Sequence, residues 1–144
     1  MKIMLLVSVV LICSSVVLGQ SSNKRKPVKT GTPNGLFTPA IISGEMVFTS
    51  GQIGVDSKGQ LGETFEAQFE QVFKNLSAVL DAAGSSSEHI LKATVFLADM
   101  NDYAKLNELY RAKFKGDPPA RTCVQVAKLP RDAKVEMEAV AVLK

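Results

Sequence analysis

The sequence predicts an α+β fold in which a single sheet is covered on one face by two helices, in the order β-β-α-β-α-β-β. Two observations lead to this prediction. Apolar and polar residues alternate with period two in segments near residues 40–54 and 120–143, which is typical of half-buried strands. Between them, apolar residues recur at three- and four-residue spacing, which is typical of helices packed on a core.

Residues 1–19 are predicted to be a secretory signal peptide. Lys2 supplies a basic start, Ile3 to Leu18 is an apolar run interrupted by serines, and a small-residue cleavage site precedes Gln20. An uncleaved anchor is the alternative. The leader predicts the secretory pathway or the extracellular space. N-terminal sequencing of the mature protein should therefore begin near Gln20, and a soluble protein that starts at Met1 would contradict it.

Residues 20–33 are predicted to be a flexible basic tail, because a polar segment without apolar periodicity cannot bury enough surface to offset its ordering cost. The folded domain is then expected over residues 34–144. It begins with strands at 40–43 and 46–54, joined by a turn at Gly44.

The first helix is predicted from an apolar stripe that ends before Gly84, a residue that favours helix termination. The stripe consists of Phe65, Phe69, Val72, Phe73, Leu76, Val79 and Leu80. A strand is expected at 92–97. A second helix follows, with Asn101 as its expected cap and with Tyr103, Leu106, Tyr110 and Phe114 on its apolar side.

The last quarter of the chain is interpreted as two neighbouring strands joined by a turn at 129–132. Arg121 and Cys123 share one face of the first strand, while Glu136 and Glu138 lie opposite the apolar face of the second. An arginine can bind both oxygens of a planar carboxylate, and a nearby carboxylate can position or deprotonate a water. The pair therefore indicates hydrolysis of a small carboxylic acid without a metal.

Other chemistries find little support in the sequence. The formal net charge of +3 gives no argument for nucleic-acid or membrane-surface binding. Phosphate-binding glycine motifs and metal-ligand spacings are not found. Cys123 would be alone after Cys13 leaves with the leader, so it is either a half-buried strand residue or a pocket thiol beside Arg121. The one histidine, His89, is expected in a loop.

The sheet face away from the helices must also be hidden. Val140 and Val142 share that face with Glu136 and Glu138 on the last strand. A face that is partly apolar and partly charged suggests packing against another subunit, so the sequence itself predicts an oligomer.

Several segments, in order, resemble the reactive intermediate deaminase family, also called Rid, YjgF or RutC. They are MVFTSGQIG at 46–54, TVFLADMNDY at 94–103, LNELY at 106–110, PARTCVQVAKLP at 119–130 and KVEMEAVAV at 134–142. The resemblance implies a chorismate-mutase-like fold and a homotrimer with active clefts between subunits. It also implies that the protein deaminates 2-aminoacrylate/2-iminopropanoate and 2-iminobutanoate by hydrolysis, without a cofactor, to give 2-oxo acids and ammonia. These substrates arise from pyridoxal-phosphate-dependent dehydratases.

Carried over residue by residue, the resemblance implies that Arg121 binds the carboxylate and that Glu136 holds the attacking water, with Glu138 as the residue that could be confused with it. The pocket residues it implies are Ser50, Gly51, Asn107, Cys123 and Phe37. Asn107 could equally be an ordinary exposed helix residue. Phe37 occupies a position where a tyrosine is common in the family, so the ring is kept and the hydroxyl is lost.

Two alternatives stay open beside the deaminase. One is a non-enzymatic ligand-binding or chaperone-like oligomer, which would tolerate loss of the Arg121 and Glu136 pair. The other is a ribonuclease or translation inhibitor, which near-neutral charge and a single histidine disfavour. The expected substrates arise inside cells, where family members typically work in the cytoplasm or mitochondrion, whereas the leader predicts export.

Overall fold

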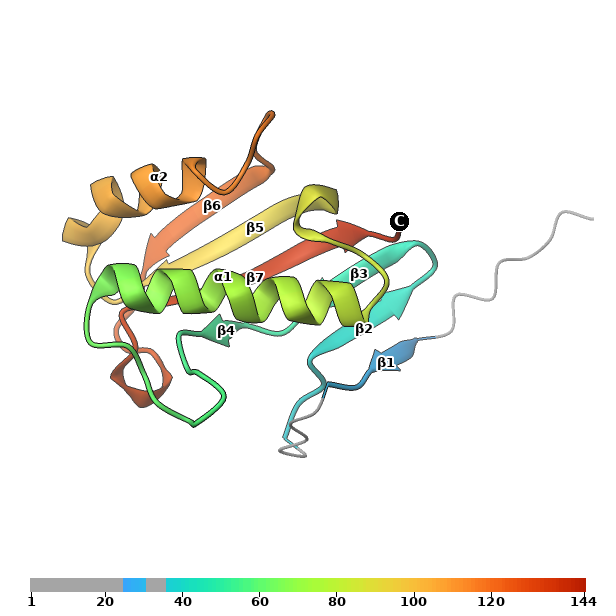
Figure 1. Cartoon of the computed structure of the whole chain (residues 1–144), viewed down its shortest axis with the longest axis horizontal. Coiled ribbons are helices and arrows are strands. Elements are labelled where there is room, and N and C mark those ends of the chain that lie inside the picture. Colours follow the sequence, from blue (N-terminus) through green and yellow to red (C-terminus); the bar gives the residue numbers. More distant parts are fainter. Residues whose placement is uncertain (1–24, 31–35) are drawn as a thin grey trace, which may run out of the picture.

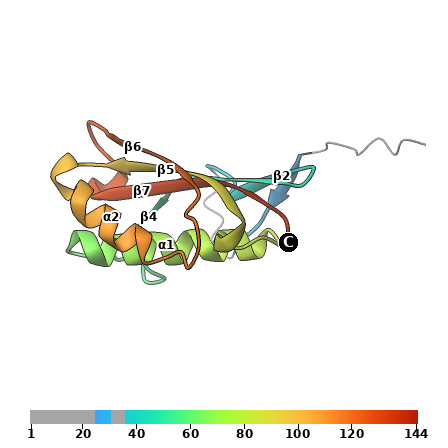
Figure 2. The ribbon, with the colours of Figure 1, turned by 90° about the horizontal axis from the view of Figure 1, so that it is seen from above.

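The computed structural model describes residues 25–30 and 36–144, which form one sheet with two helices on one face (Figures 1 and 2). The predicted α+β architecture is confirmed. The sheet order is β1 (Lys26–Val28), β2 (Ala40–Ser43), β3 (Met46–Thr49), β7 (Val135–Val142), β5 (Ile90–Leu97) and β6 (Ala120–Gln125), and β4 (Gln52–Ile53) also pairs with β7. The predicted leader at 1–19 lies outside the described residues.

Helix α1 (Phe65–Ala82) is the long helix that the apolar stripe predicts. Thr64 caps its first turn by accepting a hydrogen bond from the backbone N–H of Ala67, and Gly84 ends it with a φ of +79°. Its buried stripe, which includes Phe69 and Leu76, lies against the sheet. Within the described ranges, no helix is long and apolar enough to cross a membrane.

Helix α2 (Tyr103–Arg111) is shorter than predicted and begins differently. The expected cap at Asn101 is wrong, because Asn101 itself lies in a short 3-10 turn, where its backbone N–H donates to the Asp99 carboxylate at 2.9 Å. Phe114 lies beyond the helix end, yet its ring packs 5.0 Å from that of Tyr110. The helix therefore keeps the predicted apolar side.

The predicted tail is not entirely polar linker. Residues Lys26–Val28 form strand β1, which pairs with β2 in antiparallel register, and the Val28 side chain is only 6% exposed. One buried valine and one strand ladder are enough to order this short piece of the segment, which its polar composition did not predict.

The strand predicted at 46–54 is interrupted after Thr49. Ser50 lies just past the end of β3, where its backbone N–H donates to Pro39 O at 2.8 Å in line with the β2–β3 register, and its hydroxyl donates to Thr38 O at 2.6 Å. Both β3 and β4 still pair with β7, so the interruption produces a bend beside β7 rather than a separate sheet.

The expectation that the last two strands are neighbours is wrong. Strand β5 lies between them, parallel to β6 and antiparallel to β7. The reason is the connection through α2, because a strand–helix–strand crossover returns the chain parallel to the strand it left. β6 therefore occupies the free side of β5 at the sheet edge, and β7 fills the centre.

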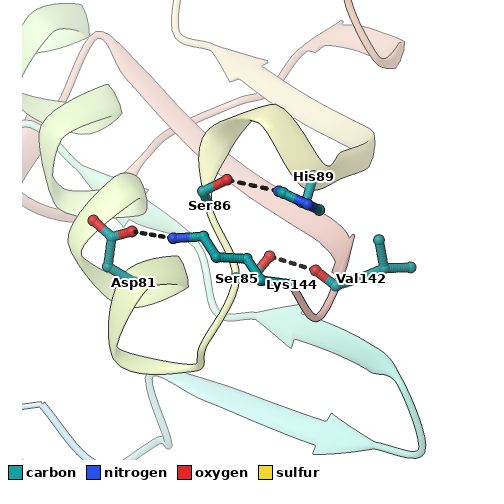
Figure 3. Close-up of polar contacts among 6 residues, drawn as sticks. All are labelled: Asp81, Ser85, Ser86, His89, Val142 and Lys144. Carbon is teal, nitrogen blue, oxygen red and sulfur yellow. Dashed lines mark hydrogen bonds and ion pairs between the residues drawn. The ribbon is translucent and has the colours of Figure 1, made fainter.

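The end of the chain is fastened to the region after α1 (Figure 3). The buried Ser85 hydroxyl donates to Val142 O at 2.6 Å, and Lys144 pairs with Asp81 at 3.7 Å. His89, in a short 3-10 turn, contacts the Ser86 hydroxyl through Nδ1 at 2.8 Å. The Ser85 and Lys144 contacts hold the end of β7 and the residues after it against the end of α1.

Candidate active site

Arg121 extends from the edge strand β6 toward the helix layer. Its register partner in β5 is Ala93, which is fully buried in the core under the helices. One guanidinium nitrogen, Nη2, donates to Asn107 Oδ1 of α2. The guanidinium carbon Cζ lies 4.7 Å from the ring centroid of Tyr110 and 5.7 Å from that of Tyr103. We call Arg121 and the residues around its guanidinium the arginine half-site; its members are Arg121, Tyr103, Asn107, Tyr110 and Cys123.

The Arg121 charge is held in place without being neutralised. No carboxylate of the described residues forms an ion pair with it, and the one side chain among them that hydrogen-bonds to it is the neutral amide of Asn107. A guanidinium has five N–H donors, so most of its fork remains available to a planar anion. The half-site is therefore suited to receive an external carboxylate.

Cys123 lies two residues farther along β6, on the same face as Arg121, and packs against the core. Burial raises the pKa of its thiol, and the nearby positive charge of Arg121 opposes this only in part. A protonated thiol is a poor nucleophile. Cys123 therefore fits the half-buried position that the sequence suggested.

Glu136 belongs to a second group of residues on the other face of the sheet. Its carboxylate stands against Gly51, where a Cβ atom would overlap Glu136 Oε1. Burial, and then the like charge of Glu138, raise the pKa of Glu136. We call Glu136, Gly51 and Ser50 the glutamate half-site. Ser50 connects it to the segment at Thr38 and Pro39 through two hydrogen bonds.

Phe37 lies on the chain segment that Ser50 anchors. Phe37 is 55% exposed, so a large apolar ring stands at the surface one residue before Thr38, whose carbonyl accepts the Ser50 hydroxyl of the glutamate half-site. An exposed ring of this size is available to a ligand or a partner chain.

The two half-sites of one chain face opposite directions. Arg121 is in register with Ala93 and Ala139, whose side chains lie on the core face, the sheet face under the helices. Glu136 is in register with Phe96 and Val124 on the other face, which we call the open face. Two strand spacings also separate them sideways by roughly 10 Å. One chain therefore cannot place both groups on one small substrate.

A shallow hollow of about 270 Å³ lies on the open face between β3, β5 and β7. Its lining consists of Phe48, Thr49, Lys92, Thr94, Glu138, Ala139 and Val140. Neither Arg121 nor Glu136 lines it, so it is separate from the predicted site residues. In the part of the chain that the structure describes, no cluster of three or more His, Cys, Asp or Glu side chains could hold a metal.

Comparison with known proteins identifies the family. The sequence profile described as Endoribonuclease L-PSP, which covers YjgF, RutC and Rid proteins, matches residues 29–143. The chain belongs to the Rid family. The Salmonella typhimurium protein named 2-iminobutanoate/2-iminopropanoate deaminase is 46% identical over 112 residues, which are 75% of this chain and 88% of that protein.

Other Rid relatives cover still more of the chain or share its fold. The Rattus norvegicus protein of the same name is 40% identical over 90% of this chain and 93% of its own length. The crystal structure of yeast Mmf1 superimposes with a TM-score of 0.80 at 35% identity, covering 84% of this chain and all of that one. RidA from an Antarctic Psychrobacter gives a TM-score of 0.78 at 39% identity, covering 83% of this chain and 100% of that one.

The placement of Tyr103 and Tyr110 beside Arg121 in this Rid protein was not predicted from the sequence. Both were expected on the apolar side of a helix, where they lie, but their rings also face Arg121. The available signal was the spacing of Tyr103, Asn107 and Tyr110, which puts three polar-tipped side chains on one helix face.

Proposed function

We propose that this Rid protein hydrolyses small 2-imino acids to 2-oxo acids and ammonia, at sites formed between two copies of the chain. The observation that carries the proposal is the immobilised, un-neutralised guanidinium of Arg121. Relatives at 40–46% identity named 2-iminobutanoate/2-iminopropanoate deaminase support the substrate class.

The chemistry requires a fixed carboxylate and a directed water. Arg121 would bind both oxygens of the substrate carboxylate and so aim the imine carbon at the water. Glu136 would take a proton from that water as its oxygen adds to the C=N carbon. That proton passes to the nitrogen to give an amino alcohol, and the proton of its new hydroxyl then moves to the nitrogen as the C–N bond breaks and the C=O bond forms, so ammonia leaves. The raised pKa of Glu136 brings it closer to the working pH of a proton shuttle.

A homotrimer that covers the open face is part of the proposal. Phe48 is 44% exposed and Val124 is 40% exposed on this face, which also carries Glu136. Burying such residues against a neighbouring copy is favourable. The same packing would carry the glutamate half-site of one chain to the arginine half-site of the next, as the family resemblance implies.

The test couples a serine or threonine dehydratase to the protein and follows the decay of the imine. The wild-type protein should accelerate that decay. Arg121→Ala should lower kcat/KM by about 100-fold, because two charge-assisted hydrogen bonds are lost. Arg121→Lys should remain poor, since a point charge cannot reproduce the fork.

Glu136→Gln should lose about 100-fold or more in turnover while still binding a 2-oxo acid. Arg131→Ala is the matched control, because Arg131 is exposed and its guanidinium contacts only Gly59 O among the described residues. If Arg121→Ala hydrolyses the imine as fast as wild type, the deaminase site is wrong and a binding oligomer becomes the better explanation.

A further inference from the structure

Helix α2 presents three side chains to the guanidinium of Arg121. Tyr103, Asn107 and Tyr110 are spaced by four and three residues, so they lie on one face of the helix. They differ in exposure, because the Tyr103 side chain is 41% exposed whereas that of Tyr110 is only 4% exposed. Tyr110 is thus the buried floor of the arginine half-site.

The contact between Tyr110 and Arg121 uses the face of the ring. The 4.7 Å between Arg121 Cζ and the ring centroid lies within the range of about 6 Å over which a cation is attracted to an aromatic face. The Tyr110 hydroxyl, by contrast, is buried and has no hydrogen-bond partner among the described residues. Burial raises the pKa of Tyr110 to about 12, so the ring stays neutral at ordinary pH.

Tyr110 is itself immobilised from behind. Its ring packs 5.0 Å from that of Phe114, and Phe114 in turn meets the Phe73 ring of α1 edge-on at 5.9 Å. A continuous row of rings therefore connects helix α1 to the guanidinium. Asn107 accepts one N–H of the fork, which sets its direction, while the Tyr110 ring supports it from one side.

We propose that Tyr110 is a positioning residue for the substrate carboxylate, because its ring face holds the Arg121 guanidinium in the orientation that receives both oxygens. The proposal rests on the proposed function and adds to it a residue that acts through Arg121. A fork that is already held loses less freedom when the ligand arrives. The effect should therefore appear in affinity more than in the chemical step.

The experiment measures the dissociation constant of 2-oxobutanoate, an unreactive carboxylate, by calorimetry, together with KM and kcat for imine hydrolysis. Tyr110→Phe keeps the ring and removes only the unpartnered hydroxyl, so binding should stay within about two-fold of wild type. Tyr110→Leu removes the ring and should weaken binding by about 3- to 30-fold, with KM rising more than kcat falls.

Phe114→Leu is the matched control, because it damages the same row of rings without touching Arg121. It should destabilise the protein as Tyr110→Leu does but weaken binding much less, because the Tyr110 ring still lies against the guanidinium. If Tyr110→Leu is too unstable to purify, Tyr103→Leu, at an exposed ring 5.7 Å from Arg121 Cζ, should still weaken binding measurably.

Three results would overturn the proposal. The first is that Phe114→Leu binds 2-oxobutanoate as weakly as Tyr110→Leu, or as weakly as Tyr103→Leu where that variant replaces it. The second is a tenfold loss of binding in Tyr110→Phe, which would assign the role to the hydroxyl, and the third is that the wild-type protein does not bind 2-oxobutanoate. The proposed reaction fails separately, if the wild-type protein binds 2-oxobutanoate but does not accelerate imine decay. In that case the order of affinities among the variants still decides the role of Tyr110.

Discussion

Gly51 is important because of the side chain that it lacks. A Cβ atom there would overlap Glu136 Oε1, the end of a flexible side chain. In Gly51→Ala the carboxylate should swing aside, so the fold survives while the water is misdirected. We expect kcat to fall by about 100-fold with a melting temperature close to that of wild type, measured by imine decay and thermal unfolding.

Gly116→Ala is the control for this substitution, since a Cβ at Gly116 meets no atom within 4 Å. It should leave both kcat and the melting temperature unchanged. Full turnover by Gly51→Ala would show that the carboxylate position at Glu136 does not control the attacking water.

The pKa of Glu136 also predicts how activity depends on pH. Burial and the charge of Glu138 raise this pKa, and a carboxyl group acts as a base only when ionised. Activity should therefore fall as the pH drops through the raised pKa. Glu138→Gln removes the like charge, lowers the pKa of Glu136, and should move the acid limb of the kcat profile to lower pH. If the acid limb of the kcat profile does not move in Glu138→Gln, the limb reports the titration of a group other than Glu136.

Candidate site residues could be named from the sequence because their chemistry is carried by residue type. Arg121 and Glu136 were proposed from what a guanidinium and a carboxylate can do, and from the ordered family segments around them, and their roles stay predictions. The ring of Tyr110 was not, since an aromatic residue at helical spacing is most simply a core residue. Only the folded contact at 4.7 Å shows its second role.

The chain directly after β4 meets helix α1 at Gly54. A Cβ added at Gly54 would lie 2.7 Å from the backbone Cα and O atoms of Gln68, which cannot swing away. Gly54→Ala should therefore lower the free energy of unfolding by roughly 2–3 kcal/mol, measured by urea denaturation. A loss below about 0.5 kcal/mol, as expected for Gly116→Ala, would mean that helix and strand separate easily.

Most helices and strands were predictable from the spacing of their apolar residues, whereas the order of the strands in the sheet was not. The apolar stripe of α1 and the alternation in β7 each identify an element and its buried face. Period does not say which strand lies beside which. The short connection at residues 126–134 suggested adjacent strands, but β5 had already taken the place next to β6 through the α2 crossover.

For the whole molecule, a site shared between chains predicts complementation. Arg121→Ala and Glu136→Gln should each lose about 100-fold in activity alone, because each lacks one half-site. When equal amounts are co-expressed and assemble at random into a closed ring, about a quarter of the sites should combine an intact Arg121 with an intact Glu136. The co-purified mixture should then recover about a quarter of wild-type activity.

The same preparation should sediment as a trimer. Recovery requires that two chains contribute to one site, so an inactive mixture of correctly assembled trimers would place both groups on a single chain. A wild-type protein that is monomeric at micromolar concentration would remove the shared site altogether. Wild-type protein at the same concentration is the reference for both the activity and the sedimentation measurement.

Strand β7 is the last strand in the sequence and the central one in the sheet, where it pairs with β3, β4 and β5. During synthesis, the strands on its two sides therefore lack their common partner until residues 135–142 have been made. Such long-range pairing forms late in folding. A polypeptide that stays open until its final residues appear can still pass through an export channel, which is the condition that the predicted leader imposes on the rest of the chain.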